Sequence, residues 1–61
     1  MNDEYLVRYA TKKRYMRFIT VYAKNMHEAK LKAEKEIGSN LDRITEISNC
    51  TFIRNALREG E

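Results

Sequence analysis

A run of basic and aromatic residues between positions 8 and 24 is the part of this sequence best suited to bind a ligand. It holds six basic residues and no acidic one, with tyrosines and a phenylalanine placed among them. Phosphate groups attract positive charge, and bases stack on flat aromatic rings. The segment therefore predicts contact with DNA or RNA, and its candidate residues are Arg8, Lys12, Lys13, Arg14, Tyr15, Arg17 and Lys24.

The same composition also has a purely structural explanation. Aromatic side chains pair across neighbouring strands and stabilise hairpins. Lysines at a turn or on an edge strand keep a sheet soluble. The segment alone leaves both explanations open.

Histidine and cysteine, the residue types typical of nucleophilic catalysis and of zinc sites, are scarce. His27 and Cys50 are the single histidine and the single cysteine, so neither has a partner at metal-ligand spacing, and an internal disulfide is excluded. The only glycines, Gly38 and Gly60, do not form a phosphate-binding loop. We expect a non-enzyme with no catalytic residues, no metal, no cofactor and no small-molecule substrate.

The length and the charge distribution narrow the class of protein further. A chain of 61 residues predicts one small domain over residues 1–61. Its net charge of +3 is the sum of −2 over residues 1–7, +6 over residues 8–24 and −1 over residues 25–61. No apolar run approaches the ~20 residues of a membrane span, and the acidic start does not resemble a secretory signal. We expect a cytoplasmic protein that does not contact membranes.

Two strands are predicted to position the basic residues. Residues 5–11 and 15–23 are rich in aromatic and β-branched residues that alternate with a period of two. Strands so close in sequence pair most easily as an antiparallel hairpin. The connection Lys12-Lys13-Arg14 carries no Asn-Gly or Asp-Gly signal, so the type of turn stays open.

A helix is predicted from Met26 to Ile37. Asn25 is a favoured N-cap, Glu28 can complete a capping box, and Gly38 provides a C-terminal stop. Helical spacing places one apolar stripe against the sheet and leaves Leu31 exposed on the opposite side. The members of the stripe are Met26, Ala29, Ala33 and Ile37.

The last third of the chain has a weaker signal. Residues 44–49 are predicted as a third strand, although Leu41, Ile44 and Ile47 are three apart and also fit a short helix capped at Ser39. Residues 51–59 fit either a helical turn or an extension of the strand. The predicted class is α+β, a small antiparallel sheet of order ββαβ with one helix packed on one face and a C-terminal extension that is a strand or a short helix.

One helix covers only one face of such a sheet. The other face would expose Leu6, Met16, Phe18 and Tyr22, more apolar surface than a small monomer usually leaves in water. The cover could be the C-terminal Phe52, Ile53 and Leu57 folded back, a second copy of the chain, or another protein. The candidate partner-binding residues are Met16, Phe18, Tyr22 and Leu31.

Residues 17–33, RFITVYAKNMHEAKLKA, resemble a pattern found in small phage and mobile-element proteins of the DpnD/PcfM-like type. In that pattern a strand ends in Val-x-Ala, an Asn or Ser caps the helix, and Glu-Ala-x-x-x-Ala carries the packing stripe. The resemblance covers about a quarter of the chain. It implies a ββαβ fold and a phage or mobile-element setting.

Three functions follow as hypotheses. The first is a small binding protein that contacts nucleic acid, or a nucleic-acid-processing complex, through a basic aromatic hairpin. The second is an inhibitor that binds a host enzyme or a host defence protein. The third is a structural homodimer.

Overall fold

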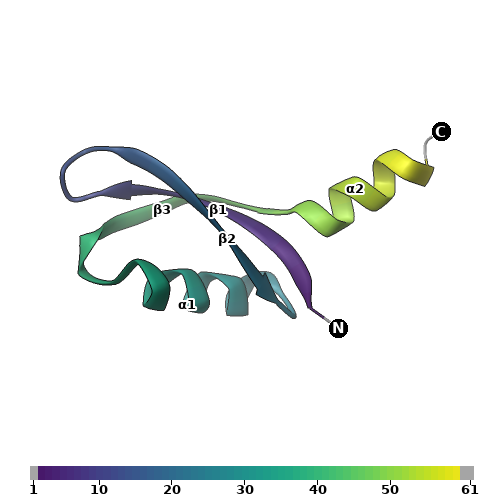
Figure 1. The fold of residues 1–61 in the computed structure, drawn as a ribbon, viewed down its shortest axis with the longest axis horizontal. Coiled ribbons are helices and arrows are strands. Elements are labelled where there is room, and N and C mark those ends of the chain that lie inside the picture. Colours follow the sequence, from purple (N-terminus) through teal and green to yellow (C-terminus); the bar gives the residue numbers. More distant parts are fainter. Residues whose placement is uncertain (1, 60–61) are drawn as a thin grey trace.

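The fold is a three-stranded antiparallel sheet with one helix on one face and a second helix beyond the end of the sheet (Figure 1). A computed structural model describes residues 2–59. The strand order is β2-β1-β3. The elements are β1 (Asp3–Thr11), β2 (Met16–Ala23), α1 (Met26–Ile37), a short 3-10 helix η1 (Gly38–Asn40), β3 (Leu41–Asn49) and α2 (Cys50–Glu59). The predicted α+β class is confirmed, and the order is ββαβα.

The β1–β2 hairpin closes through a turn that the sequence left undefined. The Thr11 amide donates to the Tyr15 carbonyl at 2.8 Å, and the Arg14 amide donates to the Thr11 carbonyl at 2.9 Å. The hydroxyl of Thr11, which is buried, accepts from the Tyr15 amide at 3.1 Å. Arg14 takes a left-handed conformation with φ of 68°. A non-glycine residue therefore sits where a glycine is favoured.

This conformation predicts that Arg14→Gly stabilises the protein. The left-handed region costs a residue with a Cβ about 1–2 kcal/mol, which outweighs the ~0.5–1 kcal/mol entropy loss of a glycine. We expect the free energy of unfolding to rise by about 0.5–1 kcal/mol in urea denaturation. Lys13→Gly is the control, since Lys13 has no positive φ, and it should lower the free energy of unfolding. Loss of stability in both variants would contradict the predicted strain.

Helix α1 begins and ends where the sequence predicts. The Asn25 side chain accepts from the Glu28 amide at 2.8 Å, and Gly38, with φ of 73°, donates its amide to the Glu34 carbonyl. The Glu28 carboxylate does not complete a capping box and instead contacts the Lys32 ammonium at 3.2 Å. One of the two predicted capping bonds is thus present.

The hydrophobic core lies between α1 and the sheet. Ala29 and Ala33 are fully buried, and Ile37 packs against the core cluster from the end of the helix. Met26 was wrongly predicted to belong to this stripe, because it is more than half exposed. Met26 is the first residue of α1 and lies at the end of the sheet, just after the chain has left β2. The buried cluster consists of Tyr5, Val7, Val21, Ala23, Ala29 and Ala33.

Strand β3 contains two irregularities that explain its unusual sequence period. Leu41, Ile44 and Ile47 are three residues apart, yet they pair with β1 residues two apart, Thr11, Tyr9 and Val7. The register shifts between Arg8 and Tyr9 and again between Ala10 and Thr11. Each bulge adds one residue to β3, so all three apolar side chains stay on the same face. The predicted strand is confirmed and starts three residues earlier than expected.

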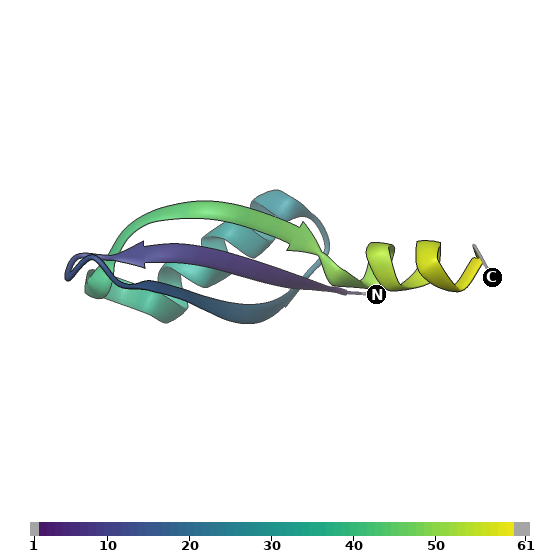
Figure 2. The same ribbon diagram turned by 90° about the horizontal axis from the view of Figure 1, so that it is seen from above.

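Helix α2 does not cover the sheet. Figures 1 and 2 show it continuing past the end of β3, away from the hairpin turn. Its Phe52, Ile53 and Leu57 are exposed. The expectation that these residues could fold back over the uncovered face is therefore wrong in this structure.

Candidate nucleic-acid interface

The turn of the hairpin concentrates positive charge at one end of the molecule. Lys12, Lys13 and Arg14 are consecutive and exposed. They lie at the end opposite α2 (Figures 1 and 2). The Lys12 amide also donates to the Asn40 carbonyl at 3.0 Å, which ties the turn to η1. The three cations are therefore held on a supported turn.

Of the other three predicted cations, only Arg17 lies beside the turn, and Arg8 and Lys24 lie apart from it. Arg8 points to the face opposite α1 and contacts Glu46 of β3 at 3.8 Å, so its charge is partly opposed. Arg17 pairs with Tyr9 close to the turn. Lys24 follows the far end of β2, roughly 30 Å from the turn at the rise of a strand. The six basic residues of the segment thus divide among three places.

A shallow hollow lies beside the basic turn. Its volume is about 570 Å³. Tyr15, which lines it, is exposed, whereas Tyr9 is buried and unavailable for stacking. An exposed aromatic ring next to an arginine provides a flat surface and a cation at one site. The lining residues are Tyr9, Tyr15, Met16, Arg17, Phe18 and Ile19.

Arg43 is a basic neighbour of the turn that the sequence reasoning missed. It lies on β3, where it pairs with Ala10 of β1, and it is exposed. The adjacent Asp42, also exposed, brings a negative charge to the same end. Asp42 and Arg43 lie near the turn only because β3 pairs with β1. The bulges in β3 determine which face of the sheet each of them occupies. No local pattern around residue 43 would have indicated this position.

The face opposite α1 gathers three of the four predicted partner-binding residues. Met16, Phe18 and Tyr22 are neighbours along β2 and are 63%, 66% and 58% exposed. Leu31 is exposed on α1, as predicted, and lies on a different side of the molecule. We call this uncovered face the open face; it carries Glu4, Leu6, Arg8, Ala10, Met16, Phe18, Thr20, Tyr22, Arg43, Glu46 and Ser48.

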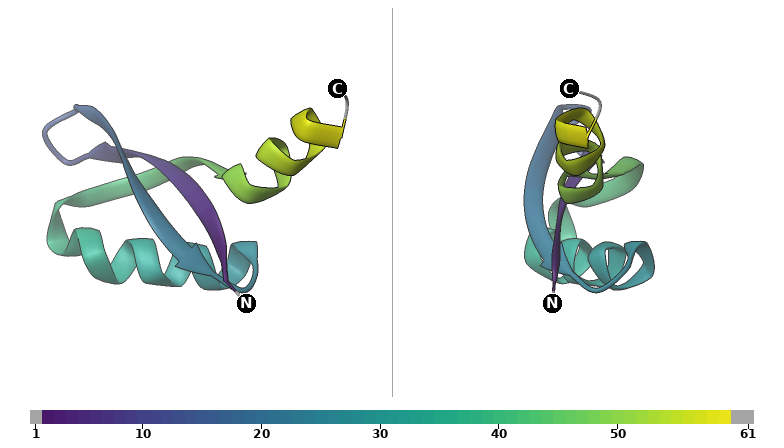
Figure 3. Two further views of the ribbon diagram at one scale, coloured as in Figure 1. Left: turned by 45° about the vertical axis from the view of Figure 1, so that its right-hand side comes forward. Right: turned by 90° about the vertical axis from the view of Figure 1, so that its right-hand side faces the viewer.

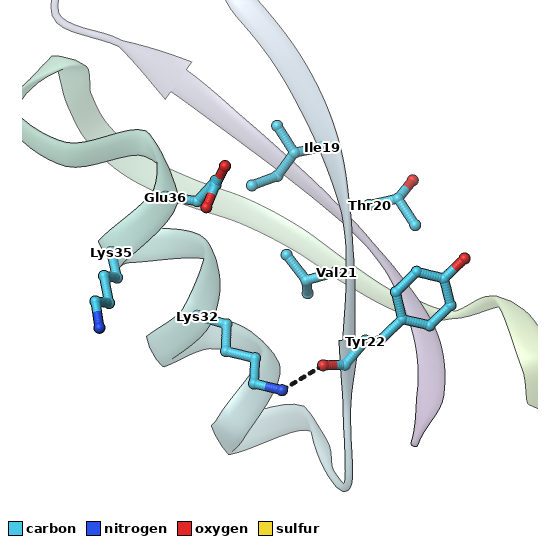
Figure 4. Close-up of a pocket in the computed structure, with 7 residues that line it drawn as sticks. All are labelled: Ile19, Thr20, Val21, Tyr22, Lys32, Lys35 and Glu36. Carbon is cyan, nitrogen blue, oxygen red and sulfur yellow. Dashed lines mark hydrogen bonds between the residues drawn. The ribbon is translucent and has the colours of Figure 1, made fainter. Parts of the chain in front are cut away.

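A larger groove, of about 980 Å³, runs between β2 and α1 (Figure 4). Lys32 projects across it and donates to the Tyr22 carbonyl at 2.6 Å. The same ammonium contacts Glu28 at 3.2 Å, and this hydrogen bond lowers the pKa of the Glu28 carboxyl. Lys32 thus covers part of the free edge of β2. Its charge is engaged within the protein, which makes this groove a poorer anion site than the turn.

Comparison with known proteins finds no family model, no curated protein and no solved structure that matches the chain. Within residues 2–59, no helix combines the length and the apolar composition that crossing a bilayer requires. A function is therefore inferred from the geometry of the hairpin end.

Proposed function

We propose that this chain is a small binding protein that holds single-stranded nucleic acid at the hairpin end. The observation that carries the proposal is the exposed cluster Lys12-Lys13-Arg14 directly beside a hollow with an exposed aromatic rim. Lysine and arginine side chains neutralise phosphates, and aromatic rings stack on bases. Both requirements are met within a few residues of one turn.

The aromatic component favours a single strand over a duplex. In a duplex the flat faces of the bases are covered by their neighbours, whereas in a single strand a base is free to stack on a protein side chain. Tyr15 presents its ring at the rim of the hollow, and Arg17 lies beside it. The base would enter the hollow against Tyr15, while the turn contacts the adjacent phosphates.

The charge of the site sets the expected strength of binding. Lys12, Lys13, Arg14 and Arg17 could neutralise about four phosphates, which for a single strand gives a slope of log affinity against log salt near −3. Contacts to the backbone carry little sequence information. The proposed activity is therefore binding with weak sequence preference.

A salt titration tests the proposal. The affinity for a fluorescently labelled single-stranded oligonucleotide is measured by anisotropy between about 50 and 200 mM salt, the range over which phosphate contacts respond strongly. We expect a slope near −3 and weaker binding to the matching duplex. Absence of binding to both probes at the lowest salt would refute the function. Equal affinity for the single strand and the duplex would contradict the proposed stacking of a base on Tyr15.

A further inference from the structure

Helix α2 exposes an apolar side that no other part of residues 2–59 covers. Phe52, Ile53 and Leu57 are 70%, 49% and 70% exposed, and Ala56 is also exposed. At 100° per residue these four positions lie on one side of the helix, which we call the α2 stripe. A helix of ten residues is marginal in water without a packing partner.

The junction between β3 and α2 keeps this helix away from its own sheet. Asn49 is the last residue of β3 and also caps α2, since its side chain accepts from the Phe52 amide at 2.7 Å. The Glu4 amide donates to the Thr51 hydroxyl at 2.8 Å, and Arg54 contacts the Glu4 carboxylate at 3.5 Å. These bonds tie the start of α2 to the start of β1, and no loop separates β3 from α2.

The views of Figure 3 show where α2 points as a result. It extends beyond the end of the sheet and rises on the side opposite α1. This is the side of the open face. Helix α2 thus lies on the side of the open face, but past the end of its own sheet.

The chain also buries little apolar surface by itself. Val7 is the largest side chain that is fully buried, and the helix contributes only alanines to the fully buried set. The core of a domain of this length supplies only marginal stability, which association would increase. Cys50 is a free cysteine. Association would bury the two large exposed surfaces that the chain presents.

We propose that two copies of the chain form a symmetric dimer in which α2 of each copy lies across the open face of the other. Such an interface is self-complementary, because each chain contributes one α2 stripe and one open face. The lengths agree. A ten-residue helix spans about 15 Å, and β2 from Met16 to Tyr22 spans about 20 Å.

The exposed area is sufficient for a stable dimer. Six large apolar side chains are involved, Met16, Phe18, Tyr22, Phe52, Ile53 and Leu57, each roughly half to two-thirds exposed. Taking about 200 Å² for a whole large side chain gives roughly 700 Å² per chain, close to the ~800 Å² that each partner buries in a standard interface. The basic turn lies at the opposite end of each copy. Met16 and Phe18 also line the hollow beside the turn, so the dimer would share these two residues with the proposed nucleic-acid site. Sedimentation in the absence of nucleic acid tests the dimer separately from that binding.

Sedimentation equilibrium across a concentration series tests the dimer with three variants. The unmodified chain should show twice its mass of 7.3 kDa. Leu57→Glu in the α2 stripe and Phe18→Glu on the open face should each weaken association by at least about 30-fold, the loss typical of a central interface residue. Leu31→Glu is the matched control and should leave the dimer intact, because Leu31 is similarly exposed on α1. Circular dichroism confirms that each variant is folded.

Three outcomes would overturn the proposal. A chain that is monomeric at every concentration would show that no second copy covers these surfaces. Loss of the dimer in Leu57→Glu with no change in Phe18→Glu would show that the α2 helices pair with each other. Equal loss in Leu31→Glu would place the interface elsewhere.

Discussion

Replacing Lys12 and Lys13 by glutamate is expected to lower the affinity for single-stranded nucleic acid at least about 100-fold at low salt, since two phosphate contacts are lost and two repulsive charges are added. Both side chains are exposed at the turn, so the fold should be unchanged. The slope of log affinity against log salt should fall from near −3 to about −1.5. Arg14 is left in place because its backbone conformation is strained.

The control for this variant is Lys24→Glu with Lys30→Glu, which changes the net charge by the same amount. Lys24 lies at the far end of β2, and Lys30 is exposed on α1. Charges farther than a Debye length, about 10 Å, are largely screened at moderate salt. We expect less than about a threefold loss of affinity. Similar losses in the two double variants would mean that net charge, and not the hairpin end, drives binding.

The elements built from local signals could be predicted from the sequence. The alternation over residues 5–11 and 15–23 identified both strands of the hairpin, and Asn25 and Gly38 identified the ends of α1. These signals are local because a strand period, an N-cap and a C-terminal glycine depend on a few neighbouring residues. The charge cluster at the turn was predictable for the same reason, since its three residues are consecutive.

Features that depend on distant pairing could not be predicted in this way. The spacing of Leu41, Ile44 and Ile47 fitted a helix as well as a strand, because the two bulges that reconcile it with β1 exist only in the paired sheet. The approach of Glu46 to Arg8 is set by the same register. Apolar residues that repeat every three positions in one strand, opposite a strand in which they repeat every two, indicate repeated bulges.

The direction of α2 could also not be predicted from the sequence. Its apolar residues were identified, but their exposure follows from bonds between Glu4 and residues 51 and 54, which are nearly fifty positions away. A sequence pattern shows that a helix has an apolar side. The rest of the fold decides which surface that side can reach.

Ala33→Leu is expected to remove most of the stability of the domain. Ala29 and Ala33 are fully buried against the sheet, where they share the core with Val7 and Ala23. Additional methyl groups in a filled contact cost about 1–3 kcal/mol. A core of this size rarely supplies more than about 3–5 kcal/mol in total. Separation of α1 from the sheet should therefore lower the midpoint of thermal unfolding by about 10–20 °C.

Glu34→Leu provides the matched control for this prediction, because it introduces the same side chain one position along α1. Glu34 is exposed, and surface substitutions usually change the free energy of unfolding by less than about 0.5 kcal/mol. Thermal unfolding followed by circular dichroism compares the two variants at equal protein concentration, since association would add to the measured stability. A higher midpoint for Ala33→Leu would show that the contact between α1 and the sheet contains unfilled space. The core would then rely less on the close approach that the alanines permit.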